Sequence, residues 1–222
     1  MAFVDLSRGR LVLKAVLAGP PAVGKTSRLQ QIAEVGRTES YGRTALGPQR
    51  MAVMSLETAR EGPRLRWTAP ERMHLTLVFL ADVPPAHLER VVASVDAAAA
   101  TVGPFDLELH GLGAFPKPAR PRVFVIDVTE GREALGAMHR AQAGALADAG
   151  VEVEDRPLRP HLTIARPKRP PHREDTEALV RELEPWRWRF RVEQVELIES
   201  QLRPEGPLYT VRHATGLSGP RR

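Results

Sequence analysis

The chain has 222 residues, 42% of them hydrophobic and 27% charged, which is enough for one large domain or two small ones with a true core. It contains no cysteine, which excludes disulfides and cysteine-based metal sites and favours a reducing, cytoplasmic setting. Lys and Arg outnumber Asp and Glu by 32 to 27, so the charge suits a polyanionic partner without identifying one, and no apolar run is long enough for a membrane helix.

The first 60 residues predict a short β-α-β segment. An apolar run at residues 11–18 ends at Gly-Pro-Pro and indicates a strand. Residues 25–35 then place Leu and Ile at helical spacing, and residues 51–56 form another brief apolar run that indicates a second strand. We expect residues 1–60 to form a segment of this kind ahead of a two-lobed domain at residues 64–217.

The loop between that first strand and helix matches the phosphate-binding pattern G-x-x-x-x-G-K-[ST]. Backbone N–H groups of such a loop cradle phosphates, while its lysine and hydroxyl serve the outer phosphates and Mg²⁺. The candidate nucleotide-phosphate ligands are Gly19, Gly24, Lys25 and Thr26. Residues 11–57 resemble the beginning of a small GTPase. No Asp-x-x-Gly or Asn-Lys-x-Asp motif follows, and about 60 residues are too few for the usual nucleotide-binding sheet, so we expect an incomplete module.

From residue 64 onward the predicted elements repeat. The first half predicts a strand at 74–80, a helix at 84–102 and strands at 105–112 and 123–128, and the second predicts a strand at 161–166, a helix at 175–183 and strands at 190–198 and 208–212. An Ala-rich helix at 131–149 lies between the halves. His74 and His161 are 161 − 74 = 87 positions apart, and Phe105 and Phe190 are 190 − 105 = 85 apart. This repetition predicts two similar lobes that face each other across a cleft.

Each half begins with the same polar–apolar alternation. The tetrapeptides are His74-Leu75-Thr76-Leu77 and His161-Leu162-Thr163-Ile164. Because side chains alternate between the faces of a strand, His and Thr share one face while the apolar residues pack the other. Opening a cyclic phosphate with water needs one base and one acid, which two imidazoles can supply, and threonine hydroxyls can donate to phosphate oxygens. A single His-x-Thr is usually structural, but two copies at equivalent positions indicate catalysis.

The stretches around these motifs resemble the 2H phosphoesterases, and specifically the bacterial RNA 2′,3′-cyclic phosphodiesterases, also called 2′–5′ RNA ligases. The resemblance rests on WTAPERMHLTLVFLADV (67–83), GPFDLELHGLGAFPKPARPRVFVIDV (103–128) and DRPLRPHLTIARP (155–167), and covers residues 64–217. It implies a bilobal α+β fold with pseudo-two-fold symmetry, in which two antiparallel sheets flank a central cleft and helices lie outside. It also implies that His74 donates a proton to the 3′ oxygen and His161 acts on water, without metal or cofactor.

Several residues near the motifs are further candidates. Arg159 and Arg166 flank the second histidine and could neutralise phosphate, although surface salt bridges are an equal alternative. Phe115 and Tyr209 could stack on a base; we expect Phe115 to line the site and Tyr209 to lie in the core. The remaining histidines have no metal-ligand spacing with acidic partners, so no metal site is predicted.

The sequence leaves alternatives to hydrolysis open. The same two histidines could join RNA ends through a 2′–5′ bond, the lobes could bind RNA ends without turnover, or the N-terminal loop could form a nucleoside-triphosphate switch. The expected partners are RNA with 2′,3′-cyclic phosphate ends or small cyclic nucleotides, and the expected state is a monomer. Relatives carry a strand and helix ahead of the first histidine, and residues 11–35 are expected to replace them. Residues 218–222 are expected to form a basic tail.

Overall fold

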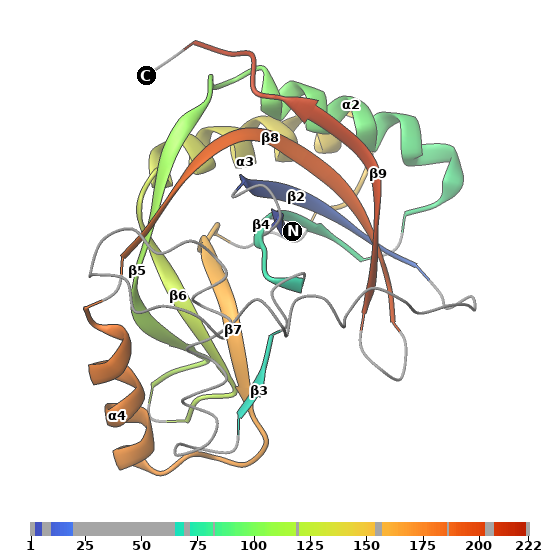
Figure 1. Cartoon of the computed structure of the whole chain (residues 1–222). Helices are drawn as coiled ribbons and strands as arrows, with labels where there is room; N and C mark the ends of the chain where they lie inside the picture. The colour runs from blue at the N-terminus through green and yellow to red at the C-terminus, as the bar shows by residue number, and fades with distance from the viewer. Residues whose placement is uncertain are drawn as a thin grey trace.

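All nine described strands belong to one strongly bent sheet, and the two ends of this sheet form an upper and a lower lobe (Figure 1). The computed structural model describes residues 3–5, 10–19, 65–68, 72–81, 83–118, 120–153, 157–185, 187–202 and 207–220. The elements in chain order are β1 (Phe3–Asp5), β2 (Arg10–Gly19), β3 (Leu65–Trp67), β4 (Leu75–Leu80), η3 (Pro85–His87), α2 (Leu88–Ala99), β5 (Phe105–Phe115), β6 (Val123–Glu130), α3 (Arg132–Asp148), β7 (His161–Pro167), α4 (Arg173–Leu183), β8 (Arg187–Gln201) and β9 (Leu208–Gly216).

Strand β8 belongs to both lobes. Its first part, residues 187–192, pairs with β5, and the lower lobe continues from β5 through β6 and β7 to β3. Its second part, residues 192–201, pairs with β2 on one side, and residues 194–201 pair with β9 on the other. The expected α+β bilobal fold is confirmed. Its two sheets are continuous because one 15-residue strand runs through both.

Strand β2 lies inside the upper lobe, between β4 and β8, and is parallel to both. The strand expected at residues 11–18 is therefore confirmed, and it supplies the neighbour that the first histidine strand needs. Its parallel pairing departs from the purely antiparallel arrangement that was expected. The helix at 25–35 and the strand at 51–56 lie outside the described residues, and the boundary at residues 60–64 remains a prediction.

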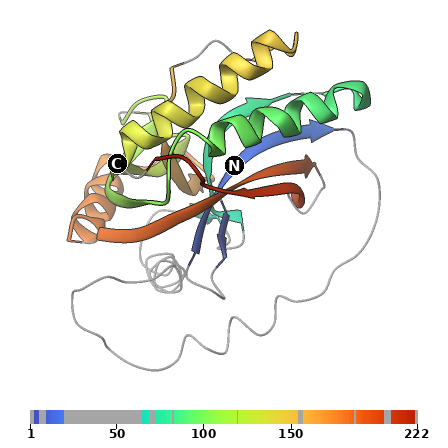
Figure 2. The same cartoon turned by 90° about the horizontal axis from the view of Figure 1, so that it is seen from above.

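The helices cover the outside of the bent sheet. Helices α2 and α3 lie side by side over the upper lobe, and α4 lies beside the lower lobe (Figure 2). Helix α2 buries Val91, Val95 and Ala98, whose spacing places them on one face. The predicted Ala-rich helix is confirmed as α3, and the helices expected at 84–102 and 175–183 are confirmed as α2, with η3 before it, and α4. No helix in the described part of the chain is long and apolar enough to cross a bilayer.

The described end of the chain is held against the upper lobe. The backbone N–H of Ser218 donates to the carbonyl oxygen of Ala99 at 3.0 Å, and that of Gly219 donates to Val102 at 3.1 Å. The N–H of Gly103 donates in turn to the carbonyl oxygen of Pro220 at 2.8 Å. The backbone of residues 218–220 is therefore hydrogen-bonded to the end of α2 and the turn after it, whereas Arg221 and Arg222, the basic residues of the predicted tail, lie outside the described residues.

Two glycine substitutions should have opposite effects on the free energy of unfolding. Gly131 precedes α3 with a φ of 86°, and a Cβ there would lie 3.0 Å from the carbonyl oxygen of Asp106. Gly144 lies within α3, and a Cβ there would meet no atom within 4 Å. Gly131→Ala should therefore lower the free energy of unfolding in urea by about 1–2 kcal/mol, and Gly144→Ala should raise it by about 0.5–1 kcal/mol. Equal shifts in the two variants would contradict this account.

Candidate active site

The two histidine motifs have the alternation that the sequence predicts. His74 immediately precedes β4, and His161 is the first residue of β7. The apolar members of the motifs are buried, with exposed fractions of 1% for Leu75 and 1% for Leu162. The histidines and the threonines, Thr76 and Thr163, remain partly exposed. Each strand therefore presents an imidazole and a hydroxyl on its open face while its other face packs the core.

Each imidazole is held by an equivalent hydrogen bond to the backbone. His74 Nδ1 lies 2.6 Å from the carbonyl oxygen of Arg72, and His161 Nδ1 lies 2.6 Å from that of Arg159. Because a carbonyl oxygen only accepts, Nδ1 is the nitrogen that carries the proton in each ring. Nε2 is then the nitrogen that can act as a base when the ring is neutral and as an acid when it is protonated. This arrangement suits general acid–base catalysis but does not assign the two roles.

Arg72 is a site residue that the sequence analysis missed. The motif is longer than four residues, since Arg72-Met73-His74 repeats as Arg159-Pro160-His161. The repeated arginine two positions before each histidine was the signal that could have identified it. Its carbonyl oxygen orients His74, as Arg159 does for His161.

Phe115 and Arg159 surround His161. The ring of Phe115, at the end of β5, lies 4.8 Å from the His161 ring between centroids, with the two planes tilted by 54°. The guanidinium carbon of Arg159 lies 4.7 Å from the centroid of Phe115, in the geometry of a cation–π contact. The structure thus brings together three of the residues that the sequence proposed, with Phe115 in contact with both of the others.

Tyr209 contacts the other histidine. Its ring, on β9, lies 5.7 Å from the His74 ring in an edge-on arrangement with an angle of 80°. The expectation that Tyr209 belongs to the core was wrong, because the pairing of β9 with β8 leaves it half-buried beside His74. Burial raises the pKa of the Tyr209 phenol, and the positive charges of Arg72 and Arg166 oppose this rise only in part. The phenol therefore remains a hydrogen-bond donor well into the alkaline range.

A β-bulge turns Arg166 toward the same side as the second histidine. Val125 of β6 pairs with Thr163 and Phe124 pairs with Ala165, so β7 has one additional residue, Ile164. Ile164 and Ala165 are both buried, whereas Arg166 is exposed. A bulge reverses the alternation of a strand, which explains why the Arg166 side chain leaves the core face. In this position its positive charge lowers the pKa of the Tyr209 phenol.

The salt-bridge alternative for the two arginines is not supported where the structure is described. Among the described residues, neither Arg159 nor Arg166 has a carboxylate within 4.0 Å. The residue opposite Arg166 on β3 is itself a cation, Arg66. A guanidinium can bind an anion with several donors, and no carboxylate of the described residues competes with an anion for these two.

Asp127 is a second residue that the sequence analysis missed. It lies directly opposite His161 on β6, and directly opposed residues share a face of the sheet. Gly113 leaves the room for its carboxylate, because a Cβ at that position would lie 3.2 Å from Asp127 Oδ2 and 2.9 Å from Val125 Cγ2. No local pattern indicated Asp127, since it occurs in an ordinary apolar strand and gains its neighbour only when β6 pairs with β7.

The remaining predictions concern a metal and a nucleotide loop. Across the described ranges, no group of three or more His, Cys, Asp or Glu side chains is placed to hold a metal ion. Gly19 is the last residue of β2. Gly24, Lys25 and Thr26 lie outside the described residues, so a nucleotide site at this loop remains a prediction.

The sequence is similar to known phosphodiesterases. Proteins named RNA 2′,3′-cyclic phosphodiesterase include one from Methanothermobacter thermautotrophicus, 33% identical over 148 residues, which are 66% of this chain and 79% of that protein. One from Thermus thermophilus is 34% identical over 158 residues, 68% of this chain and 74% of that protein. One from Geobacillus stearothermophilus is 36% identical over 123 residues, 55% of this chain, but the match spans only 39% of that protein's length.

Solved structures share the fold. A Thermus thermophilus protein, TT0787, has a TM-score of 0.61 and 28% identity, with 78% of this chain and 92% of that chain covered. Escherichia coli LigT, solved in complex with 3′-AMP, has a TM-score of 0.58 and 21% identity, with coverages of 78% and 94%, which shows a likeness of fold alone. The family model described as the 2′-5′ RNA ligase superfamily matches residues 48–203. The chain therefore belongs to the 2′-5′ RNA ligase superfamily, the 2H phosphoesterases that its paired motifs resemble.

Proposed function

We propose that this protein hydrolyses RNA 2′,3′-cyclic phosphate ends to 2′-phosphomonoesters, with His74 and His161 as its acid and base. The observation that carries the proposal is the matched hydrogen bond of each Nδ1 to a backbone carbonyl, which fixes the same tautomer in both rings and makes Nε2 the nitrogen that can exchange a proton. The names of the relatives, RNA 2′,3′-cyclic phosphodiesterase, support the choice of substrate.

In the proposed reaction, water attacks phosphorus on the side opposite the 3′ oxygen. Nε2 of His161 takes a proton from the water as the new P–O bond forms. The bond from phosphorus to the 3′ oxygen breaks, and Nε2 of His74 protonates that oxygen, so the phosphate remains on the 2′ oxygen. The geometry suits this pair, and the assignment of acid and base within it follows the family pattern.

The charge that develops on the phosphate needs fixed donors. The hydroxyls of Thr76 and Thr163 lie on the open faces beside their histidines and can donate to the non-bridging oxygens. Arg159 and Arg166 add positive charge without an acidic partner in the described part of the chain. Phe115, already in contact with His161 and Arg159, presents a ring on which the terminal base can stack.

A second activity uses the same site. If the 5′-hydroxyl of another RNA replaces water as the nucleophile, the same proton transfers form a 2′–5′ phosphodiester and release the 3′-hydroxyl. The name of the matching family, the 2′-5′ RNA ligase superfamily, favours this activity as the alternative. An RNA-end binding module without turnover would show affinity for cyclic phosphate ends and no product.

Replacing either histidine should abolish most of the activity. His74→Ala and His161→Ala should each lower kcat for a nucleoside 2′,3′-cyclic phosphate by about 10² to 10⁴, because each removes a general acid or base. The product of the wild type should be the 2′-phosphate alone, resolved from the 3′-phosphate by chromatography. His87→Ala, ahead of α2, is the matched control. A near-normal rate in either site variant would refute the pairing.

The pH dependence of kcat should be bell-shaped and insensitive to EDTA. One imidazole must be neutral and the other protonated, so the rate should fall at both the acid and the alkaline end. Initial rates with and without EDTA across the pH range measure this. Loss of activity on chelation would replace the two-histidine mechanism with a metal-dependent one.

Tyr209→Phe should weaken catalysis without moving the pH profile. The variant keeps the ring against His74 and removes one hydroxyl, so kcat/KM should fall by about tenfold, the value of one hydrogen bond. Because burial raises the pKa of this phenol, it stays protonated through the neutral range in which imidazoles generally exchange protons. The alkaline limb should therefore keep its position. A shift of that limb in Tyr209→Phe would show that the tyrosine itself titrates in the reaction.

A further inference from the structure

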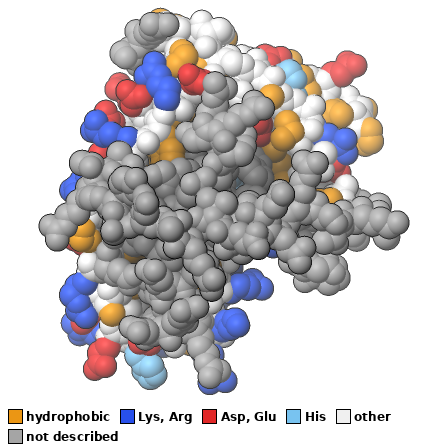
Figure 3. Space-filling view, viewed as in Figure 1, with side chains coloured by type: hydrophobic (Ala, Val, Ile, Leu, Met, Phe, Trp, Pro, Cys, Tyr) orange, Lys and Arg blue, Asp and Glu red, His pale blue; other side chains and the backbone are white. Residues whose placement is uncertain are grey.

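Seven cations gather at the open end of the lower lobe. We call this surface the basic edge. Its members are Arg66, Lys117, Arg120, Arg122, Arg166, Lys168 and Arg169. All seven side chains are exposed. They come from β3, the turn between β5 and β6, and the end of β7, and blue side chains are visible along the right side of the lower lobe in Figure 3.

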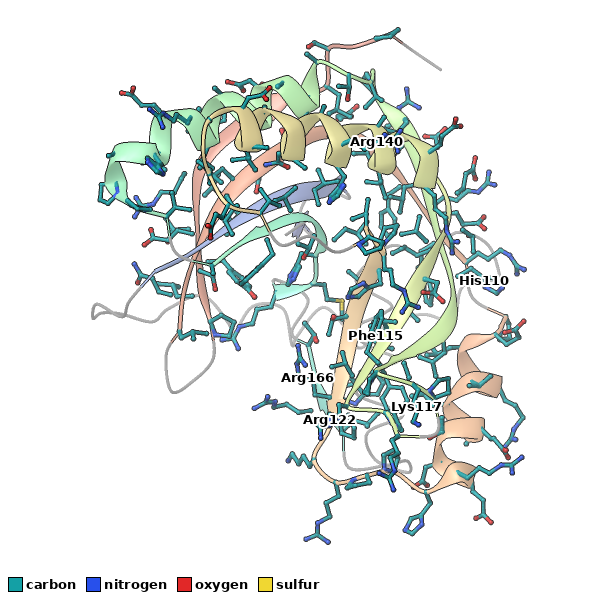
Figure 4. The ribbon with its side chains drawn as sticks, turned by 180° about the vertical axis from the view of Figure 1, so that it is seen from behind. His110, Phe115, Lys117, Arg122, Arg140 and Arg166 are labelled. Carbon is teal, nitrogen blue, oxygen red and sulfur yellow. The ribbon has the colours of Figure 1, made fainter. Side chains whose placement is uncertain are left out.

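Strand pairing places these segments together. Arg66 of β3 lies opposite Arg166 of β7. Phe124 pairs with Ala165, so Arg122, just before β6, lies beside the end of β7. The backbone N–H of Arg122 also donates to the carbonyl oxygen of Phe115 at 2.7 Å, which closes the turn that carries Lys117. Figure 4 shows Lys117, Arg122 and Arg166 in this part of the lower lobe, below Phe115.

Among the described residues, the cations of the basic edge have no acidic partners of the kind that other arginines of this chain have. On the exposed side of β8, Arg189 pairs with Glu108 at 3.0 Å and Glu130 at 2.9 Å, and Arg191 pairs with Asp106 at 3.1 Å. None of the seven cations of the basic edge has a carboxylate within 4.0 Å in the ranges that the structure describes.

Two of the three acidic residues that come next in sequence, Asp175 and Glu177, are engaged at the start of α4, and the third, Glu174, is exposed. Asp175 accepts from the backbone N–H of His172 at 3.3 Å, and Glu177 pairs with Arg173 at 2.6 Å. Among the described residues, the mutual repulsion of these cations is therefore not offset by an ion pair. A surface of this kind attracts a polyanion.

The basic edge is continuous with the active site. Arg166 belongs to the edge, and its positive charge lowers the pKa of Tyr209. Phe115 accepts a hydrogen bond from Arg122 in the β5–β6 turn, and its ring contacts His161. From His161 to Pro167, β7 extends about 20 Å at the usual rise per residue, which is room for several nucleotides. A cyclic phosphate is the 3′ end of its RNA, so the rest of the strand leaves the site on its 5′ side.

We propose that the basic edge binds the phosphodiester backbone of the RNA strand on the 5′ side of the cyclic phosphate. This inference rests on the proposed function and adds a substrate preference: the protein favours oligoribonucleotides over nucleoside cyclic phosphates. Contacts with phosphates carry no sequence information, so the preference depends on length and on salt, not on base sequence.

The test compares two triple variants that remove the same charge. Arg122→Gln/Lys168→Gln/Arg169→Gln removes three of the seven charges of the edge and leaves Arg159 and Arg166 in place. Arg90→Gln/Arg140→Gln/Arg181→Gln neutralises three exposed cations on the helices; Arg140 lies at the opposite end of the molecule (Figure 4). The substrates are a short single-stranded oligoribonucleotide with a 2′,3′-cyclic phosphate end and the nucleoside 2′,3′-cyclic phosphate of the same base. Circular dichroism checks that both variants are folded.

The edge variant should lower the ratio of kcat/KM for the oligonucleotide to that for the nucleoside cyclic phosphate by roughly ten- to a hundredfold. The slope of log K for oligonucleotide binding against log salt, from fluorescence anisotropy, should become shallower by about 2, because three phosphate contacts at about 0.7 each are lost. The helix variant should keep both the ratio and the slope of the wild type.

The outcomes separate this inference from the proposed function. If the wild type cleaves the nucleoside cyclic phosphate but the edge variant keeps the wild-type ratio and slope, the basic edge does not bind RNA and the proposed function stands. If the helix variant changes as much as the edge variant, the effect is net charge alone and the inference is overturned. If the wild type cleaves neither substrate, the proposed function fails, and the salt slope of binding still decides the role of the edge.

Discussion

The hydrogen-bond ladders of β8 are the constraint on which the rest of this structure depends. In the lower lobe, β8 holds β5, and through β6 this ladder positions β7 and His161. In the upper lobe, β8 holds β2, and β2 in turn pairs with β4, the strand next to His74. The same strand positions Tyr209 through β9. Each imidazole is therefore fixed to a shared scaffold, which is what catalysis by two groups from different lobes requires.

The described surface has one region where cations form ion pairs and another where they do not. Arginines on the exposed side of β8 are matched by carboxylates on β5 and β6, so that face is close to neutral. Around His161 and at the end of β7, the cations have no carboxylate within 4.0 Å among the described residues. Cations without an ion pair attract an anion more strongly than paired ones do, so this contrast supports the proposed binding of a phosphate end.

The motifs were predictable because the information that specifies them is local. Alternation within His74–Leu77 and His161–Ile164 decides which side chains face the core, and the structure confirms it. The helices α2, α3 and α4 and most strands were also predicted, since periodicity and breakers are short-range signals. Tyr209, by contrast, was assigned to the core, because its neighbour His74 is 135 positions away (209 − 74 = 135) and nothing in its own strand indicates that contact.

By itself, the sequence determined the paired His-x-Thr strands, the repeat of the two halves and the family to which they belong. Only the tertiary structure decided that β2 enters the sheet between β4 and β8, that the bulge at Ile164 turns Arg166 outward, and that Asp127 lies opposite His161. The physical reason is the distance along the chain over which each interaction acts. Alternation and helix periodicity act over a few residues, whereas strand order and register are set by hydrogen bonds and packing between segments far apart in the chain.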